Sequence, residues 1–514
     1  MRCRRRCSKE AVVAALSPSF EEFERAWQQG RNQLVFARLA ADLDTPVSLM
    51  LKLADARENS FMFESVTGGE VRGRYSIIGM KPDVIWECRG EKARINRQAR
   101  FEERFEDLPG HPFDSLRALI AESRIEMPED LPAAAAGLFG YLGYDMIRLV
   151  EKLPGGNPDP LGVPDAVLLR PSVVAVLDGV KGDVILCAPA FQSSGLSARA
   201  AYAQAAERVM DALRDLDRTP NQSREMGETA KVGPLVSNFT AAGYKAAVEK
   251  AKDYIRAGDI FQVVPAQRWR ADFPLPPFAL YRSLRRTNPS PFMFYLNFGG
   301  FQIVGASPEI LVRLRAGEVT IRPIAGTRPR GATAAEDKAL EEELLADKKE
   351  LAEHLMLLDL GRNDVGRVAK IGTVHPTEKF IIERYSHVMH IVSNVVGDLA
   401  EGEDALSALL AGLPAGTVSG APKVRAMEII DELEPEKRGI YGGGVGYFAA
   451  NGEMDMCIAL RTAVVKDQTL YIQAGGGVVF DSDPEGEYQE SVNKSKALRK
   501  AAEDAGLFVR HGNA

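Results

Sequence analysis

The sequence predicts an α+β fold in which large, mostly antiparallel β-sheets are covered by helices. Two observations predict this fold class. Strong helical patterns alternate irregularly with β-rich segments that carry glycine-bearing turns. The chain also has 514 residues, 45% of them hydrophobic, and shows no internal repeat at the periods of solenoids or propellers. A chain of this length and composition can bury a large core.

The elements follow one another in four predicted regions. Residues 1–17 form a basic leader whose apolar run is too short for a signal peptide, so we expect it to be disordered. Residues 18–217 begin with an acidic helix capped by Ser19 and continue mostly as strands and turns. Residues 218–236 are polar, contain Pro and Gly, and are expected to be a linker. Residues 237–514 begin with a helix and then mix β-rich segments with strong helices.

The composition restricts the function classes. The chain carries 64 basic and 71 acidic residues, a net charge of −7, which disfavours general binding to nucleic acids or anionic membranes. Its five cysteines are too few and too scattered for a disulfide framework. We therefore expect a cytoplasmic protein.

Two pairs of glutamates have the spacing of a metal site. Glu350 and Glu353 are three residues apart on one predicted helix, and Glu487 and Glu490 are three apart on the last one. Mg²⁺ is usually held by one or two carboxylates, several waters and an anionic ligand group. Spacing alone favours a plainer interpretation, in which both pairs lie on solvated helix faces and Glu490 pairs with Lys494.

Three glycine-rich turns could bind an anion, because backbone N–H groups without side chains can approach it closely. They are residues 325–327 (AGT), 441–446 (YGGGVG) and 474–477 (AGGG). Tight turns between strands explain each of them equally well. None matches the P-loop or the dinucleotide fingerprint, which disfavours a nucleotide-binding oxidoreductase.

Two further residues could act on a charged substrate. Arg461 ends an apolar segment, where a guanidinium normally has a carboxylate partner, and a structural carboxylate is the more common case. His390 lies in an alternating, strand-like run and could exchange protons near neutral pH. A single histidine in a strand is more often a structural residue.

Taken together and in order, these segments resemble the chorismate-utilising enzymes, in particular the large subunits of anthranilate synthases. The resemblance extends from about residue 18 to residue 507 and implies sheets packed as a sandwich with helices outside. The matching words are FESVTGGEVRGRYSIIG (63–79), DIFQVVPAQ (259–267), NPSPFMFY (288–295), GASPE (305–309), RPIAGTRPRG (322–331), ELAEHLMLLDLGRND (350–364), RYSHVMHIVS (384–393), PAGTVSGAPK (414–423), YGGGVGYF (441–448) and QAGGGVV (473–479).

The resemblance implies that residues 237–514 convert chorismate and ammonia to anthranilate and pyruvate. It implies that Mg²⁺ is held by Glu353 and Glu490, with Glu350 and Glu487 acting through water. In this interpretation the metal holds the ring carboxylate of chorismate.

The same resemblance assigns the substrate and catalytic residues. The ring carboxylate would be enclosed by Gly475, Gly476 and Gly477. The enolpyruvyl carboxylate would bind to Arg461 and Tyr441, since a planar guanidinium suits a bidentate partner. The ring would be lined by Gly326 and Thr327, with Thr417 close to them. Glu309 would protonate the departing hydroxyl. His390 would transfer a proton in the step that releases pyruvate.

Two positions distinguish among the members that the chain resembles. Aminodeoxychorismate synthases often carry a nucleophilic lysine where this chain has Ala325. Members that add water to the ring carry a lysine base where this chain has Gln262. Both positions favour anthranilate formation. The alternatives are an aminodeoxychorismate synthase large subunit and a catalytically inactive tryptophan sensor.

The resemblance also implies a partner and an inhibitor. No cysteine lies in a Gly-flanked nucleophile turn, so ammonia is expected from a separate glutamine amidotransferase subunit in a hetero-oligomer. Residues 18–217 would be the regulatory region. Tryptophan, as a feedback inhibitor, would bind to Glu64, Ser65, Pro291, Phe292 and Met293, although plain core packing also explains these residues.

Overall fold

The computed structural model describes residues 15–54, 57–65, 73–219, 232–385 and 388–509. Most of the predicted leader and the centre of the predicted linker, residues 220–231, lie outside the described residues. Helix α1 (Phe20–Gln28) begins as predicted, because Ser19 and Glu22 form a reciprocal capping box. In the part of the chain that is described, no helix is both long and apolar enough to cross a membrane.

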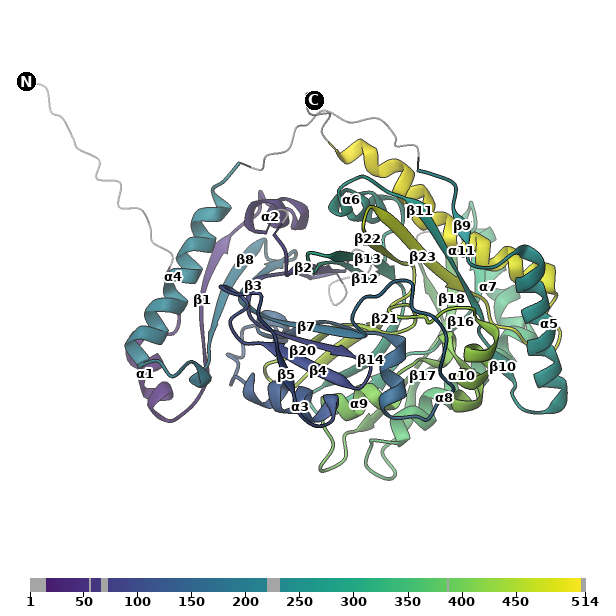
Figure 1. Cartoon of the computed structure of the whole chain (residues 1–514), viewed down its shortest axis with the longest axis horizontal. Coiled ribbons are helices and arrows are strands. Elements are labelled where there is room, and N and C mark those ends of the chain that lie inside the picture. Colours follow the sequence, from purple (N-terminus) through teal and green to yellow (C-terminus); the bar gives the residue numbers. More distant parts are fainter. Residues whose placement is uncertain (1–14, 55–56, 66–72, 220–231, 386–387, 510–514) are drawn as a thin grey trace, which may run out of the picture.

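Two long strands, β3 (Tyr75–Arg89) and β7 (Ala166–Asp178), run through the centre of the molecule (Figure 1). They pair antiparallel along their length, with a register shift between Pro82 and Val84. Such an irregularity bends a strand. Before it, β3 pairs with β2 (Ser60–Glu64), and after it with β4 (Lys92–Asn96). The two strands therefore belong to both sheets of the sandwich.

The first sheet is antiparallel throughout. Its order is β1 (Gln33–Ala40), β8 (Asp183–Ala190), β7, β3, β2, β12 (Phe292–Asn297), β13 (Phe301–Ser307), β22 (Thr462–Lys466), β23 (Thr469–Gly475), β11 (Ala266–Asp272) and β9 (Val236–Ser237).

The second sheet is also antiparallel. Its order is β5 (Glu106–Leu108), β4, β3, β7, β6 (Gly137–Leu142), β20 (Gly444–Ala449), β21 (Met454–Ile458), β14 (Ile310–Arg315), β15 (Glu318–Ile321) and β18 (Val388–Asp398). Strand β18 also pairs with β16 (Ile324–Pro329) and β17 (His375–Arg384).

Three apolar cores give the molecule its layers. Phe61, Phe139 and Phe294 belong to the core between the sheets. A second core lies under helices on the first sheet, namely α1, α2 (Pro46–Leu53), α4 (Ala198–Leu216), α6 (Pro277–Thr287) and α11 (Pro484–Asp504). A third lies under α3 (Pro112–Glu122), α8 (Lys348–Gly366) and α9 (Ala405–Gly412) on the second sheet. This sandwich with helices outside confirms the predicted fold class (Figure 1).

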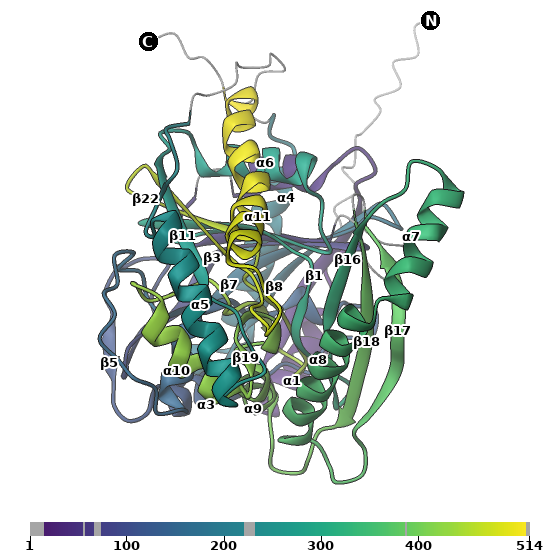
Figure 2. The ribbon, with the colours of Figure 1, turned by 90° about the vertical axis from the view of Figure 1, so that its right-hand side faces the viewer.

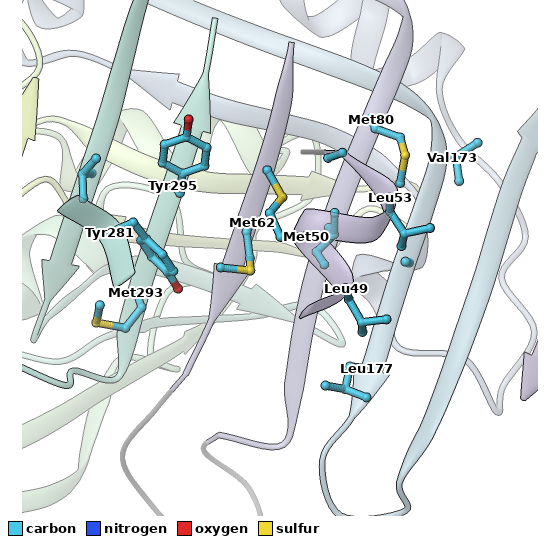
Figure 3. Close-up of a cluster of buried hydrophobic side chains, with 14 of the residues drawn as sticks. Leu49, Met50, Leu53, Met62, Met80, Val173, Leu177, Tyr281, Met293 and Tyr295 are labelled. Atoms are coloured by element: carbon cyan, nitrogen blue, oxygen red, sulfur yellow. The ribbon is translucent and has the colours of Figure 1, made fainter. Parts of the chain in front are cut away.

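Successive side chains along β2 and β3 point alternately into two different cores. Met62 of β2 and Met80 of β3 lie in the core under the helices together with Leu49 and Met50 of helix α2 (Figure 3). Their strand neighbours point the other way; Phe61, for example, belongs to the core between the sheets. This period of two is what a strand with both faces covered requires.

A smaller unit lies beside the sheets and carries part of the candidate site. Helices α5 (Ala241–Ala257) and α10 (Lys423–Leu433) pack on the strand pair β10 (Gln262–Val263) and β19 (Gly420–Ala421) (Figure 2). Helix α7 (Ala334–Ala346) packs with α8 against β16 and β18.

The predicted division into a regulatory region, residues 18–217, and a catalytic region, residues 237–514, stays a prediction. Strands of the two regions share hydrogen bonds, since β2 pairs with β12 and β6 pairs with β20. Any regulatory and catalytic functions therefore share one continuous sandwich.

Candidate active site

Gly475 ends strand β23, and Gly476 and Gly477 follow it. Two helices direct their carboxylates toward this glycine turn. A methyl group built onto Gly476 would lie 2.9 Å from Glu487 Oε2 and 3.5 Å from Glu490 Oε1, both on α11. A methyl group built onto Gly477 would lie 3.8 Å from Glu353 Oε1 on α8. Because the turn has no side chains, glutamates from two helices approach the same place. The structure thus brings together the two acidic pairs that the sequence places far apart.

Gln262 lies between the turn and helix α8. Its Nε2 donates a hydrogen bond of 3.3 Å to Glu353 Oε1, and a methyl group on Gly477 would lie 2.3 Å from that nitrogen. The strand that carries it is fixed to the turn, because Val263 and Val478 exchange backbone hydrogen bonds. The Gln262 amide is therefore part of the same site.

Two of the carboxylates have a raised pKa. Burial raises the pKa of Glu353, and the charges of Glu350 and Glu490 add to this effect. Burial also raises the pKa of Glu487, again with a contribution from Glu490. A site in which carboxylates repel one another gains most from a bound cation. Part of the compensation comes from Lys494, whose Nζ lies 2.7 Å from Glu490 Oε1 and donates to the Gly475 carbonyl at 2.9 Å.

These residues fit Mg²⁺. Within the described ranges, no three His, Cys, Asp or Glu side chains are already gathered at metal-ligating distances. Mg²⁺ needs only one or two carboxylates, because water and an anionic ligand complete its octahedron. Glu487 Oε2 is buried, and the described residues provide no hydrogen-bond partner for it. Such an atom is available to a metal-bound water. Glu350 is already engaged, since it accepts a hydrogen bond of 3.3 Å from Arg328.

Glu309 has the environment of a general acid. It lies between β13 and β14 and is 6% exposed. Burial raises its pKa to about 8, although a 3.1 Å hydrogen bond from the Thr417 hydroxyl acts in the opposite direction. The carboxyl group is therefore mainly protonated at pH 7 and can donate a proton.

His390 on β18 faces the predicted ring-binding residues on β16. Its Nδ1 lies 3.0 Å from the Gly326 carbonyl and 3.1 Å from Thr327 Oγ1. A carbonyl only accepts, so the proton is assigned to Nδ1, which leaves Nε2 as the acceptor. Burial lowers the pKa of His390, so the neutral form dominates at pH 7. Gly326 has φ of +70° at an irregularity between β16 and β18, a conformation that favours glycine.

Arg461 is a half-buried cation. Over the part of the chain that is described, its guanidinium forms no ion pair, and desolvation lowers its pKa. A desolvated charge of this kind is costly unless an anion accompanies it. Tyr441 is buried, and a hydrogen bond links its hydroxyl to the backbone of Gly475 in the glycine turn. The structural carboxylate that the sequence made the more common case does not appear among the described residues.

All five predicted inhibitor-binding residues line one cavity of about 530 Å³ inside the sandwich. Its walls include apolar side chains of the core between the sheets, such as Phe63, Ile77 and Val445. Glu64 is already satisfied, because it accepts hydrogen bonds from Arg285 Nε at 2.6 Å and from the Tyr281 hydroxyl. Tyr281, Tyr295 and Met293 lie close together in the core under the helices (Figure 3).

Sequence reasoning missed Tyr385. This residue lines the cavity, and its ring lies 5.4 Å from the His390 ring in a T-shaped contact. Tyr385 lies in the same sequence motif as His390, RYSHVMHIVS. Nothing in the spacing of Tyr385 distinguishes it from an ordinary strand residue.

Comparison with known proteins places this geometry in a family. The family model described as chorismate binding enzyme matches residues 81–500. Anthranilate synthase component 1 from Cereibacter sphaeroides is 81% identical, over 96% of this chain and 99% of its own. The corresponding protein from Pseudomonas putida is 49% identical over 94% and 97%. The crystal structure of anthranilate synthase component I from Streptococcus pneumoniae superposes with a TM-score of 0.74 at 38% identity, covering 84% of this chain and 94% of that one.

The fold and the matched residues define a chorismate-binding enzyme. Within that class, the chain belongs to the anthranilate synthase component 1 family, whose members are chorismate-utilising lyases. The resemblance that the sequence motifs indicated is therefore confirmed. The component number also indicates that a second component exists.

Proposed function

We propose that the chain makes anthranilate and pyruvate from chorismate and ammonia with Mg²⁺ held by Glu353 and Glu490. Glu350 and Glu487 would support the metal through water. The observation that carries the proposal is the approach of carboxylates from α8 and α11 to one glycine turn. When bound, Mg²⁺ would neutralise these carboxylates and the ring carboxylate of chorismate.

Two substrate carboxylates would then have separate binding sites. The ring carboxylate would lie against Gly475, Gly476 and Gly477, where the backbone can approach it closely. The enolpyruvyl carboxylate would bind to the Arg461 guanidinium and the Tyr441 hydroxyl. The desolvation of Arg461 without an ion pair in the described residues supports this assignment.

Glu309 and His390 would move the protons. The Glu309 carboxyl would protonate the 4-hydroxyl as its C–O bond breaks, so that water leaves while ammonia forms a bond to C2. The Thr417 hydroxyl would orient that carboxyl. In the second step the proton on C2 would be removed, the enolpyruvyl C–O bond would break, and the ring would become aromatic. The free Nε2 of His390 would serve this transfer, with Thr327 and Gly326 fixing its tautomer.

Two residues favour ammonia as the nucleophile. Ala325 cannot attack the ring, in contrast to the lysine of many aminodeoxychorismate synthases. Gln262 is a neutral amide engaged with Glu353, so it cannot activate water as a lysine base does.

The proposal also includes the source of ammonia and inhibition by tryptophan. A glutamine amidotransferase subunit would supply ammonia, since Cys88, Cys187 and Cys457 are buried thiols whose pKa burial raises. Tryptophan would bind in the cavity lined by Ser65 and Phe292 and inhibit the enzyme. The buried, unpaired thiols also support a reducing, cytoplasmic location.

One assay tests the activity. Purified protein is incubated with chorismate, Mg²⁺ and an ammonium salt at mildly alkaline pH, and anthranilate is followed by its fluorescence. We expect anthranilate without any partner subunit. Absence of product, or 4-amino-4-deoxychorismate in its place, would overturn the proposal.

A further inference from the structure

Beneath the candidate active site lies an ion pair that none of the proposed steps uses. The side chains of Arg438 and Glu434 are 1% and 3% exposed. Arg438 Nε donates to both oxygens of the Glu434 carboxylate at 3.1 Å. The pair follows helix α10 and lies in the loop that leads to Tyr441.

The remaining donors of Arg438 bind two backbone segments of the site. Its NH1 donates to the Val418 carbonyl and its NH2 to the Val264 carbonyl, each at 2.5 Å. Val418 directly follows Thr417, and Val264 is two residues after Gln262. The same guanidinium lies 5.5 Å from the centre of the Tyr441 ring. Three segments that carry proposed site residues thus meet at one side chain.

Glu434 extends the connection to the glycine turn. Its Oε1 accepts a hydrogen bond of 2.9 Å from the Ala266 backbone N–H. Ala266 stands opposite Gly475 in the ladder between β11 and β23. The backbone also approaches closely here, because a methyl group on Gly475 would lie 2.3 Å from the Pro265 carbonyl oxygen. The position of the turn therefore depends on a strand that Glu434 holds.

Stability is a weak explanation for such a pair. Burying two charges costs about as much as their attraction returns, and apolar replacements of similar volume are often tolerated. What an apolar pair cannot do is hold two carbonyls, a carboxylate and an N–H group in fixed directions. Only the planar fork of arginine reaches all three acceptors at once, whereas lysine is a point charge.

We propose that Arg438 and Glu434 are positioning residues, which hold Gln262, Thr417, Tyr441 and the glycine turn in the geometry that chorismate requires. This inference rests on the proposed function. It assigns the substrate pocket a rigid support made of one buried ion pair.

The test compares two site variants with one control. Arg438→Lys keeps the charge and removes the fork, and the double variant Arg438→Met with Glu434→Leu replaces the pair by apolar groups. The control is Arg170→Met, which breaks another buried pair, with Asp83 and Glu122, in the N-terminal part of the sandwich. Melting temperature, kcat and KM for chorismate, and amide hydrogen exchange are measured for each.

We expect both site variants to melt cooperatively and the double variant to lose about 100-fold in kcat/KM, the order of loss that a misplacement of about 1 Å produces. Arg438→Lys should lose less than the double variant. Exchange should become faster at residues 262–266 and 416–419 and stay unchanged in the N-terminal strands. Arg170→Met should melt at a lower temperature and keep its kcat/KM.

Several results would overturn the inference. These are unchanged kinetics in Arg438→Lys, or kinetic losses that follow melting temperature equally in all three variants. If the double variant does not fold, Arg438→Lys decides the question. If the unmodified protein makes no anthranilate, the proposed function fails, while hydrogen exchange still tests the positioning: unchanged exchange at residues 262–266 and 416–419 overturns it.

Discussion

The cavity inside the sandwich and the site at the glycine turn differ in how their charges are satisfied. In the cavity wall, Glu64 is paired with Arg285, and Arg322 lies 2.6 Å from Glu383. At the turn, burial and neighbouring carboxylates raise the pKa of Glu353, and half-buried Arg461 has no ion pair in the described residues. A site with satisfied charges selects a ligand by volume and a few polar anchors. A site with unsatisfied charges is completed by the charges of its ligand.

The two regions nevertheless share walls. Pro308 and Ile310 line the cavity and flank Glu309 on either side. Tyr385 lines the cavity and contacts the His390 ring. A ligand in the cavity would therefore contact residues next to both proposed proton-transfer groups, Glu309 and His390. Substitutions in each region should separate effects on turnover from effects on inhibition.

The largest effect is expected at the metal. Glu490→Gln should abolish detectable anthranilate formation, because it removes a proposed direct metal ligand and even residues that only support such a ligand are worth about 10- to 100-fold. Glu485→Gln is the matched control, since Glu485 lies on the same helix and pairs with exposed Lys245. Full activity of Glu490→Gln, with an unchanged circular dichroism spectrum, would remove this glutamate from the metal site.

The next effect is expected at the general acid. Glu309→Gln should lower kcat by about 10²- to 10⁴-fold, the usual contribution of proton transfer from a positioned group. The amide keeps the shape of the side chain and can still accept from the Thr417 hydroxyl. Single-turnover rates with chorismate and ammonium measure the change. A rate within twofold of the unmodified protein would assign the proton to another residue.

Alanine substitutions in the glycine turn should lower activity to different extents. Gly477→Ala should lower activity about 100-fold, because its methyl group would displace Gln262 from Glu353. Gly476→Ala should lower activity less than Gly477→Ala, since the atom that its methyl group meets at 2.9 Å is the flexible end of the Glu487 side chain. Gly300→Ala, which meets no atom within 4 Å, is the control. Equal rates for the two turn variants would contradict the geometry.

The pH dependence follows from Glu309. Its acid form is required, and its pKa is raised to about 8, so kcat should be nearly constant below that pH. Above it, kcat should fall about tenfold per pH unit as the carboxylate forms. The pH profile should lose this alkaline limb in Glu309→Gln. A limb that persists in the variant would belong to another group.

The smallest effect is expected in the cavity. Ser65→Ala should raise the tryptophan concentration for half inhibition by about two- to tenfold, the value of one hydrogen bond, without lowering the maximal rate. The measurement is a tryptophan titration at saturating chorismate. Unchanged inhibition would exclude Ser65 from the inhibitor site, and a lower maximal rate would mean that the two regions are not separable.

The fold class and the candidate site residues are predicted from different signals, and only the fold class is confirmed. Helix α1 follows from local chemistry, because Ser19 and Glu22 cap it. The proposed roles of Glu353 and Glu490 could not be predicted from spacing, which favours a solvated face. The family motifs suggest these roles, which stay a prediction, and the structure brings both glutamates to one turn.

Long-range features could not be predicted. The bend at Pro82, which lets β3 belong to both sheets, depends on pairing with a strand about ninety residues away. Arg438 is in an irregular loop without periodicity, so only its contacts with Val264 and Val418 reveal its place under the site.

The most direct test of the central claim is calorimetric titration of Mg²⁺ into the protein with chorismate present and ammonia absent. We predict binding of one Mg²⁺ per chain in the unmodified protein and in Glu485→Gln, and loss of that binding in Glu353→Gln combined with Glu490→Gln. Equal Mg²⁺ binding by the double variant would show that the glutamates at the glycine turn do not hold the metal.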